Sequence, residues 1–261
     1  MSLLTNLVAY WKFNEGSGTS LGDATGNGNT GTLANSPTWT TGVGPENGGL
    51  TFSSASSQYV TVGTPADLNI TGTFSVMWWF KTTTTAIEFF WDKASYQSWV
   101  QTANIHSRIN QNIQSVSSPT VNDGALHCCI FVCDGTNTYN YVDNASSGLV
   151  ANANPSDSSA NTFYFGRRST GNYFDGSIGS AAIWSRAVTS TEATQLYNSG
   201  SGYPYSSWGG GSTHGLFRSN NLTGLGSGGP FFQNPLSRSI LGWRKSASGL
   251  LVPRKPKLVL A

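Results

Sequence analysis

Apolar and polar side chains alternate in short stretches along most of the chain. In residues 7–13, LVAYWKF, the side chains of Val8, Tyr10 and Lys12 would lie on one face and the others on the opposite face, a period of two that predicts a β-strand. Comparable segments recur, each bounded by Gly, Asn, Asp, Pro or Ser: IEFFWDK, YQSWVQT, SRINQNI, LHCCIFVCD, TYNYVDN, TFYFGRR and SAAIWSR. Their close spacing predicts an all-β fold, a sandwich of two antiparallel sheets.

Residues 74–80 are apolar on both faces, which is typical of a central strand. In residues 127–133, a period of two would place Cys129 and Cys133 on one face and Cys128 on the other. Three cysteines so close together match neither a disulfide framework nor a zinc-ligand spacing. We therefore interpret them as small buried hydrophobic residues rather than redox or metal-binding groups.

One segment predicts a helix. Residues 189–200 read TSTEATQLYNSG: Thr189 or Ser190 can cap the start, Leu196 would face the core and Gly200 would end the helix. A helix this short depends on the sandwich beneath it.

The turns are dense in glycine and asparagine. In GNGNTG, residues 26–31, Gly26, Gly28 and Gly31 permit positive φ and the asparagines tolerate a left-handed backbone, so we predict a compact turn. Only 10% of the residues are charged and 31 are Gly, which suits short strands joined by tight turns. A chain of 261 residues is long enough to bury a real core without disulfides or metals.

The N-terminal segment carries no readable targeting signal. It reaches Lys12 before any long apolar run develops, so we predict neither a cleaved signal peptide nor a membrane span. We expect a protein that acts inside a cell or leaves it without a cleaved leader. A virion or an extracellular surface fits the second case, since lysis releases virus particles without secretion.

Charge divides the chain near residue 207. Residues 1–207 hold seven Lys or Arg and all twelve Asp and Glu, a net charge of −5, whereas residues 208–261 hold seven Lys or Arg and no acid, a net charge of +7. The boundary, WGGGSTHG, has the composition of a flexible linker. We predict a sandwich domain over 1–207 and an extended, Gly-rich basic arm over 208–261 that does not fold alone. Its anchors to neighbouring subunits would be Trp208, Phe217, Arg218, Phe231, Phe232, Arg238, Trp243, Arg244 and Lys245.

Four groups of segments together resemble the laminin G-like, concanavalin A-like family of jelly-roll sandwiches. In chain order they are LVAYWKFNEGSGTSLGDATGNGNTGTL, then LTFSSASSQYVTV with TGTFSVMWWFKT, then DGALHCCIFVCDGTNTYNYVDN, and last NYFDGSIGSAAIWSRAVTSTEATQLYNSG. The resemblance covers roughly residues 6 to 203. It implies two curved antiparallel sheets with the first and last strands adjacent, and a function in binding glycans, proteins or a cell surface, without catalysis as the default.

The same resemblance implies a calcium ion near the loop after the first strand. The matching positions here are Glu15, Asp23, Asn27 and Asp175, whose oxygens are of the kind that calcium takes. A glycine-dense connection without a metal is the alternative. Family members commonly carry IDEV where this chain reads IGSA at 178–181, so two acids are missing.

Aromatic residues give a candidate glycan site. Trp91, Tyr96 and Trp99 flank an expected hairpin, WDKASYQSW, and Tyr173 lies near the FDG loop. Sugar rings stack on such side chains, although aromatic residues also fill sandwich cores. Signatures of catalysis are sparse. The chain lacks the alternating carboxylates of sandwich glycosidases, and His106 has no matching nucleophile or acid.

These observations lead to one functional hypothesis and one alternative. We expect a non-enzymatic structural protein of a large assembly, in particular a virion decoration or tail-associated protein. Its sandwich would project outward for adhesion to surface glycans, and its arm would bind other subunits. The alternative is an extracellular lectin-like carbohydrate-binding module. We do not expect a nucleic acid partner, since the densest basic run, PRKPK, is short.

Overall fold

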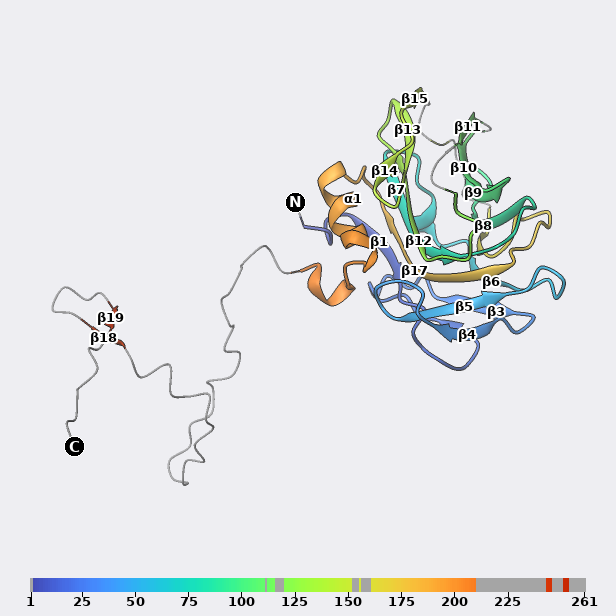
Figure 1. Cartoon of the computed structure of the whole chain (residues 1–261). Coiled ribbons are helices and arrows are strands. Elements are labelled where there is room, and N and C mark those ends of the chain that lie inside the picture. The colour runs from blue at the N-terminus through green and yellow to red at the C-terminus, as the bar shows by residue number, and fades with distance from the viewer. Residues whose placement is uncertain are drawn as a thin grey trace. The chain divides into compact units, whose positions relative to one another are not determined.

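The sandwich predicted from the sequence is present in a computed structural model of the chain (Figure 1). The described residues are 2–110, 112–115, 120–151, 155 and 161–209, with the backbone of 243–245 and 251–253. Residues up to 209 form two packed antiparallel sheets with one α-helix, which confirms the all-β fold. None of the helices in this part of the chain has the length and apolar composition needed to span a lipid bilayer.

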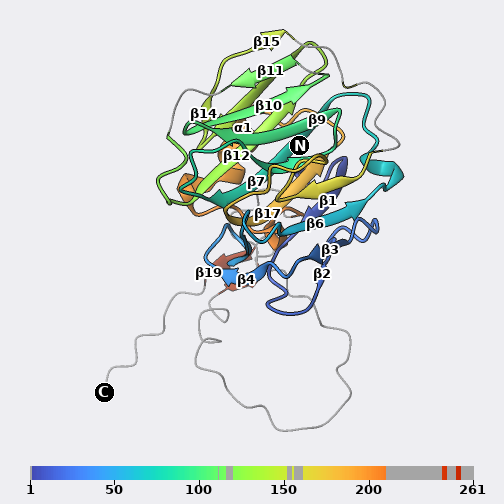
Figure 2. The same ribbon diagram turned by 90° about the vertical axis from the view of Figure 1, so that its right-hand side faces the viewer.

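Each sheet combines strands from distant parts of the sequence. The nine-stranded sheet has the order β14 (Ala145–Ser146), β13 (Asn137–Val142), β12 (His127–Cys133), β7 (Phe74–Lys81), β17 (Gly176–Trp184), β5 (Gly48–Phe52) and β4 (Thr38–Thr41), with β1 (Leu7–Trp11) paired to β17 and β15 (Val150–Ala151) paired to β13. The eight-stranded sheet has the order β11 (Asn112–Ser115), β10 (Asn104–Ile109), β9 (Tyr96–Gln101), β8 (Glu88–Asp92), β16 (Phe163–Phe165), β6 (Tyr59–Gly63), β3 (Gly31–Ala34) and β2 (Ser20–Leu21). Figure 2 looks onto the eight-stranded sheet.

Alternation along the central strands separates two apolar layers. Trp78 of β7 and Cys129 of β12 lie in the main core between the sheets, whereas Trp79 and Cys128 lie in a second cluster on the outer face of the nine-stranded sheet. All three cysteines are buried, as the sequence predicted. Burial raises the pKa of Cys128 and Cys129, so these thiols stay protonated and act as apolar groups.

Helix α1 (Ser190–Tyr197) covers this second cluster. Thr189 caps it: the Glu192 backbone N–H donates to the Thr189 hydroxyl, and the Thr189 N–H donates to the Glu192 carboxylate. The predicted stop at Gly200 is wrong, because Asn198 takes the left-handed conformation and caps the helix earlier. Two short 3₁₀ turns follow, Asn198–Gly200 and Tyr205–Ser207. In Figure 1, α1 and these turns (orange) lie on one side of the sandwich and β8 and β6 on the other.

The turn after β1 forms largely as predicted. Gly26 and Gly28 have positive φ, but Gly31 does not. A side chain at Gly31 would instead collide with Val60, since its Cβ would lie 2.6 Å from Val60 Cγ1. A further 3₁₀ turn, Ala66–Leu68, follows β6 and lies beside this region.

Strand β1 pairs with β17, the last strand of the sandwich, so the first and last strands are adjacent, as the family resemblance implied. Beside them, the loop at residues 42–47 packs against β17. A Cβ on Gly179 would lie 2.0 Å from the carbonyl oxygen of Val43, and Ser180 is fully buried. The loop therefore occupies the space that an acidic side chain would need at position 179.

The remaining described residues are β18 (Trp243–Lys245) and β19 (Leu251–Pro253), which pair antiparallel with each other. They belong to a separate unit, residues 213–261, while residues 1–212 form the other unit. The predicted division into a sandwich and an anchoring arm stays a prediction.

Candidate functional site

Two of the aromatic residues predicted to bind glycans lie in the core instead. Trp91 and Tyr96 are fully buried. Trp91 packs against Trp78 with ring centroids 5.5 Å apart, and the Tyr96 hydroxyl donates to the Leu68 carbonyl oxygen at 2.7 Å. An enclosed side chain cannot contact a ligand at the surface, so this part of the prediction is wrong. The β8–β9 hairpin exists, but alternation turns these two side chains inward.

Trp99 lies on the outer face of the same sheet. Its ring stacks on Phe89 at 5.3 Å and on His106 at 5.4 Å, between centroids. Two arginines lie over this stack: the guanidinium carbon of Arg108 is 5.7 Å from the Trp99 ring, and that of Arg168 is 5.5 Å from the Phe89 ring. Trp99 is 6% exposed and Phe89 4%. The rings therefore form a floor beneath the arginines rather than an open stacking surface.

Tyr173 belongs to a cage of three tyrosines around Arg167. The guanidinium carbon lies 4.7 Å from the ring centroid of Tyr59, 5.0 Å from that of Tyr164 and 5.1 Å from that of Tyr173, distances at which cation–π attraction operates. Arg167 also donates to the carbonyl oxygens of the next two residues, at 2.8 and 2.9 Å. All four side chains are half-buried. The cage thus holds a charged group in a fixed place at the surface.

Strand register joins the two groups into one surface. Arg108, Gln97, Asp92 and Tyr164 are cross-strand neighbours on β10, β9, β8 and β16. Asp92 is buried and accepts two backbone N–H groups, at 3.0 and 2.7 Å. We call this surface the arginine face, and define it as Tyr59, Phe89, Asp92, Gln97, Trp99, His106, Arg108, Tyr164, Arg167, Arg168 and Tyr173.

Two polar atoms of the arginine face have no partner. Gln97 Oε1 and Arg108 Nε are buried, and no described residue forms a hydrogen bond with either. A buried polar atom without a hydrogen bond costs about 1–3 kcal/mol. The cost falls on the fold, because both atoms are enclosed.

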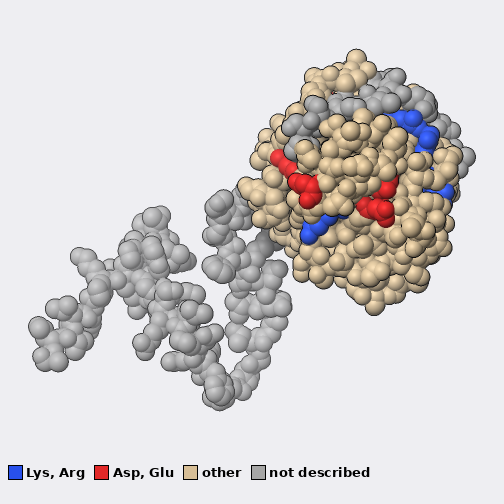
Figure 3. All heavy atoms as spheres, turned by 45° about the vertical axis from the view of Figure 1, so that its right-hand side comes forward, with Lys and Arg blue, Asp and Glu red and all other residues tan. Residues whose placement is uncertain are grey.

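The arginine face is also electrostatically unbalanced. Arg108, Arg167 and Arg168 make no ion pair with any residue in the described part of the chain, whereas Arg186 pairs with Glu192 at 2.7 Å. Burial, and then the like charge of Arg168, lowers the pKa of Arg108, and burial lowers the pKa of His106. In the view of Figure 3, one group of basic atoms lies along the right-hand edge, and a second lies between the acidic atoms near the middle.

The four residues predicted around calcium do not meet in one site. Asp175 accepts the backbone N–H and the hydroxyl of Ser54, both at 2.7 Å. Glu15 accepts the Gly22 N–H at 2.8 Å, and the Asn27 amide donates to a β1 carbonyl oxygen at 2.8 Å. Within the described ranges, no three His, Cys, Asp or Glu side chains come together as metal ligands.

A different set of oxygens surrounds Asn29, and it includes Asp23. The Asn29 Nδ2 atom lies 3.2 Å from Val8 O, 3.2 Å from Asp23 Oδ2 and 2.9 Å from Asp67 Oδ2. Its two hydrogens face three acceptors, while its own Oδ1 is buried without a partner among the described residues. With the amide turned over, four oxygens would face one another, the donor set that calcium prefers. These residues would thus supply four of the six to eight oxygens that calcium takes.

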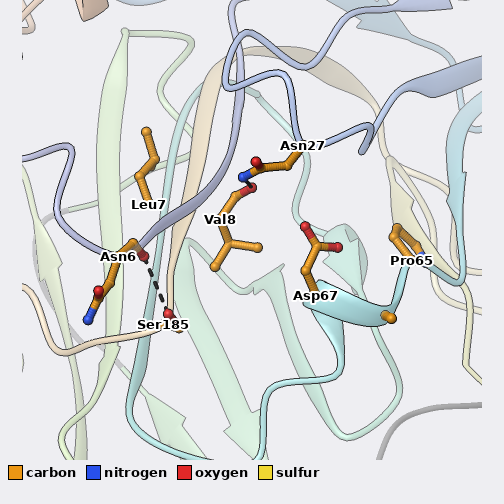
Figure 4. Close-up of a pocket in the computed structure, with 8 residues that line it drawn as sticks. Asn6, Leu7, Val8, Asn27, Pro65, Asp67 and Ser185 are labelled. Atoms are coloured by element: carbon orange, nitrogen blue, oxygen red, sulfur yellow. Dashed lines mark hydrogen bonds between the residues drawn. The ribbon is translucent and has the colours of Figure 1, made fainter.

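This cluster borders a shallow pocket of about 550 Å³, lined by residues that include Val8, Asn27 and Asp67. In Figure 4, Asp67 extends from the turn after Pro65 toward β1, and the Asn27 amide meets the Val8 carbonyl oxygen. The pocket and the arginine face have no residue in common.

Of the predicted assembly anchors, Trp208 belongs to the sandwich unit. It is 3% exposed, stacks on Trp184 at 5.5 Å between centroids, and donates from Nε1 to the Tyr203 carbonyl oxygen at 2.9 Å. Its role as an anchor is wrong, because its ring is already enclosed. Trp243, Arg244 and Lys245 form β18, while Phe217, Arg218, Phe231, Phe232 and Arg238 lie outside the described residues.

The sequence did not reveal most residues of the arginine face as a site. In TFYFGRR, Tyr164 alternates with two core phenylalanines, so its outward position was readable, and the adjacent Arg167 and Arg168 follow at once. Tyr59 lies more than a hundred residues before Arg167 in the sequence, and a loop separates Arg167 from Tyr173. No local pattern carries that information.

Comparison with known proteins identifies the family. The family model described as the concanavalin A-like lectin/glucanases superfamily matches residues 54–194. No curated protein sequence matches the chain.

Solved structures share the fold at low sequence identity. The binding domain of Paraclostridial Mosquitocidal Protein 1 has a TM-score of 0.60 at 13% identity over 75% of this chain and 52% of that one. Domain 4 of AbnA, an extracellular GH43 arabinanase from Geobacillus stearothermophilus, has a TM-score of 0.55 at 17% identity over 72% and 97%. The receptor binding domain of botulinum neurotoxin mosaic serotype C/D has a TM-score of 0.55 at 13% identity over 74% and 50%. The match spans about half the length of the two toxin domains.

Proposed function

The chain belongs to the concanavalin A-like lectin/glucanases superfamily, and from that premise we propose that its sandwich is a lectin-like carbohydrate-binding module. The binding surface is the arginine face. One observation carries the proposal: half-exposed aromatic rings and hydrogen-bonding groups share one side of a rigid sheet. Aromatic rings bind the apolar faces of sugars, and neighbouring polar groups bind the hydroxyls.

Two structural relatives support binding as the role of this fold. Domain 4 of the arabinanase was solved in complex with arabinotriose, and the neurotoxin domain is a receptor binding domain. We propose binding without catalysis, because the two carboxylates of β8 serve the fold. Glu88 accepts the Asp175 N–H at 2.7 Å, and Asp92 accepts the N–H groups of Ala94 and Ser169.

A glycan array with the full chain tests the proposal. Tyr164→Ala should weaken binding by roughly tenfold, the size of a lost ring contact with its neighbours. Tyr141→Ala is the matched control, since Tyr141 packs on the nine-stranded sheet, and it should leave binding unchanged. The proposal fails if no glycan binds, or if the two variants bind equally well.

We also propose that calcium binds at the oxygens around Asn29. Asp23, Asp67, Asn29 and the Val8 carbonyl group would hold the ion, which would supply positive charge between two carboxylates and tie the turn after β1 to that strand. Calcium should then raise the melting temperature of the chain, and Asp67→Asn should reduce this rise. If excess calcium and a chelator both leave the melting temperature unchanged, calcium does not bind at these oxygens.

A second candidate function is a structural role in a large assembly, at the surface of a virion or outside a cell. The contrast between a net charge of −5 over residues 1–207 and +7 over residues 208–261 favours it. Since Trp208 packs into the sandwich, the anchoring segment would begin after it. Deleting residues 210–261 should leave the sandwich folded and its glycan binding intact while abolishing incorporation into particles. Loss of folding would oppose this role.

A further inference from the structure

We propose that the arginine face recognises acidic sugars, meaning glycans that carry carboxylate or sulfate groups, and that Arg167, Arg108 and Arg168 bind these charges. This inference rests on the proposed carbohydrate-binding function and adds the chemical class of the ligand.

Arg167 is held in advance for such a contact. Three tyrosine rings surround its guanidinium group within 5.1 Å, and the backbone bonds from Nε and Nη2 fix the plane of the group. Its remaining N–H groups meet no acceptor among the described residues. A planar guanidinium with free N–H groups matches the two oxygens of a carboxylate or sulfate, and its fixed position reduces the entropy lost on binding.

Arg108 and Arg168 form a second anion position. Each lies over a ring of the same aromatic stack, Phe89 with Trp99. Burial, and after it the like charge of Arg168, lowers the pKa of Arg108. The buried Nε of Arg108 has no partner in the described part of the chain. An anion bound between the two arginines would relieve their repulsion.

The only carboxylate of the arginine face does not neutralise this charge. Asp92 is fully buried, and both of its oxygens accept backbone N–H groups. The negative charge of Asp92 raises the pKa of Arg108, but burial and the positive charge of Arg168 lower this pKa by more. The charge therefore stays available to a ligand.

A sugar fits this face better than other anions do. The arginines alternate with aromatic rings, so a bound residue can place its apolar face on a ring and its acidic group on a guanidinium. A nucleic acid or a lipid surface would instead gain from a broad positive field, whereas residues 1–207 carry a net charge of −5. The observations thus favour a small acidic unit within a glycan.

The test compares paired probes on the full chain by calorimetry: tri-galacturonate against its methyl ester, and a sulfated galactan oligosaccharide against the same uncharged oligosaccharide without sulfate. At least one acidic member should bind roughly tenfold or more tightly than its neutral partner, and this preference should weaken at high salt. Arg167→Gln and Arg108→Gln should each reduce the preference about tenfold, while Lys81→Gln, a charge on β7 outside the face, should not.

The outcomes separate the two proposals. Equal binding of acidic and neutral probes overturns this inference and leaves the carbohydrate-binding function standing. Binding of neither pair, together with a blank array, overturns both. Binding of single-stranded DNA or of vesicles with anionic lipid at the affinity of the acidic sugar overturns the assignment to sugars. Urea unfolding of each arginine variant ensures that lost affinity reflects the missing charge.

Discussion

The two outer faces of the sandwich are both rich in aromatic side chains. A described helix covers one of them, whereas no helix of the described part of the chain covers the other. On the nine-stranded sheet, Tyr10, Trp79 and Trp184 lie beneath α1 and residues 203–208. On the eight-stranded sheet, Tyr59 and Tyr164 stay half-buried, and arginines lie among the rings. Aromatic content alone therefore does not distinguish a core from a binding surface.

Charge accounts for the difference. The covered face offers mainly apolar side chains to the elements packed on it, and Arg186 beneath α1 is paired with Glu192 of that helix, so an amphipathic helix such as α1 can cover it. A helix laid over Arg108, Arg167 and Arg168 would have to bury three guanidinium groups without counter-charges, which costs several kcal/mol for each. The arginines thus keep their face accessible, and the same property suits it to an anionic ligand.

Removing an aromatic ring from each face should give the largest contrast. Trp208→Ala deletes a nearly buried ring that stacks on Trp184, and we expect a loss of about 3–5 kcal/mol in the free energy of unfolding. Tyr164→Ala, on the open face, should cost less than about 1.5 kcal/mol. Urea denaturation measures both. Similar losses for the two variants would contradict the distinction between the faces.

The buried ion pair under α1 gives the next effect. The Glu192 carboxylate binds both terminal nitrogens of Arg186, at 2.7 and 2.8 Å, and accepts the Thr189 N–H. Burial opposes the charge, but Arg186 and Thr189 outweigh it and lower the pKa of Glu192. Glu192→Gln leaves Arg186 without a counter-charge, so stability should fall by roughly 2–3 kcal/mol at neutral pH.

The effect of Glu192→Gln should also depend on pH. A carboxylate whose pKa is lower in the folded than in the unfolded state stabilises the fold at pH values above its unfolded pKa. This contribution disappears as the pH falls through its folded pKa. The difference between wild type and Glu192→Gln should therefore shrink in acid. Glu15→Gln, an exposed carboxylate near the turn after β1, is the control, and it should change stability by less than about 0.5 kcal/mol.

Replacing a cation of the open face should have a much smaller effect on stability. Arg108→Met removes the repulsion with Arg168 but also the contact with the Trp99 ring, so the free energy of unfolding should stay within about 1 kcal/mol of the wild type. Acidic-sugar binding should nevertheless fall. A large destabilisation would mean that Arg108 serves the fold rather than a ligand.

The smallest effect concerns His127 on β12. Burial by itself lowers the pKa of His127, but hydrogen bonds to Asp143 at 2.7 Å and Asp123 at 3.0 Å outweigh it and raise the pKa. A raised pKa stabilises the fold fully below the unfolded value, about 6.5, and this contribution disappears as the pH rises through the folded value.

Unfolding of His127→Gln and wild type at about pH 6 and about pH 9 checks this sign. The advantage of the wild type should be larger at the lower pH, by less than about 1 kcal/mol. An advantage that grows with pH would mean that the buried, neutral form of His127 is the one that stabilises the fold.

Local patterns predicted the fold well because burial on two faces leaves a strong signal. Trp78 and Trp79 occupy opposite layers, and Leu196 faces the second cluster, as their spacing indicated. The helix end was missed because the left-handed Asn198 ends the helix before the glycine that the sequence favours.

The candidate site was harder to predict, since alternation gives the face of a residue only once the phase of the strand is known. Trp91 and Trp99 both sit in the β8–β9 hairpin, yet one is in the core and the other is on the outer face. The oxygens around Asn29 depend on Asp67, which lies 38 residues away in sequence. The local pattern of a single sequence segment does not predict long-range contacts of this kind.

The first and last residues of the sandwich lie at the same corner. The Ser2 hydroxyl donates to the Trp208 carbonyl oxygen at 3.3 Å, and β1 is paired along β17. In Figure 1 this corner lies on the side opposite β8 and β6. A longer polypeptide can therefore contain this sandwich as an inserted domain. Both points of connection would then lie at one corner, on the side of the sandwich opposite β8 and β6. Tension applied through such a polypeptide would act on the paired strands β1 and β17 and on the contact between Ser2 and Trp208, rather than on the sheet that carries the arginine face.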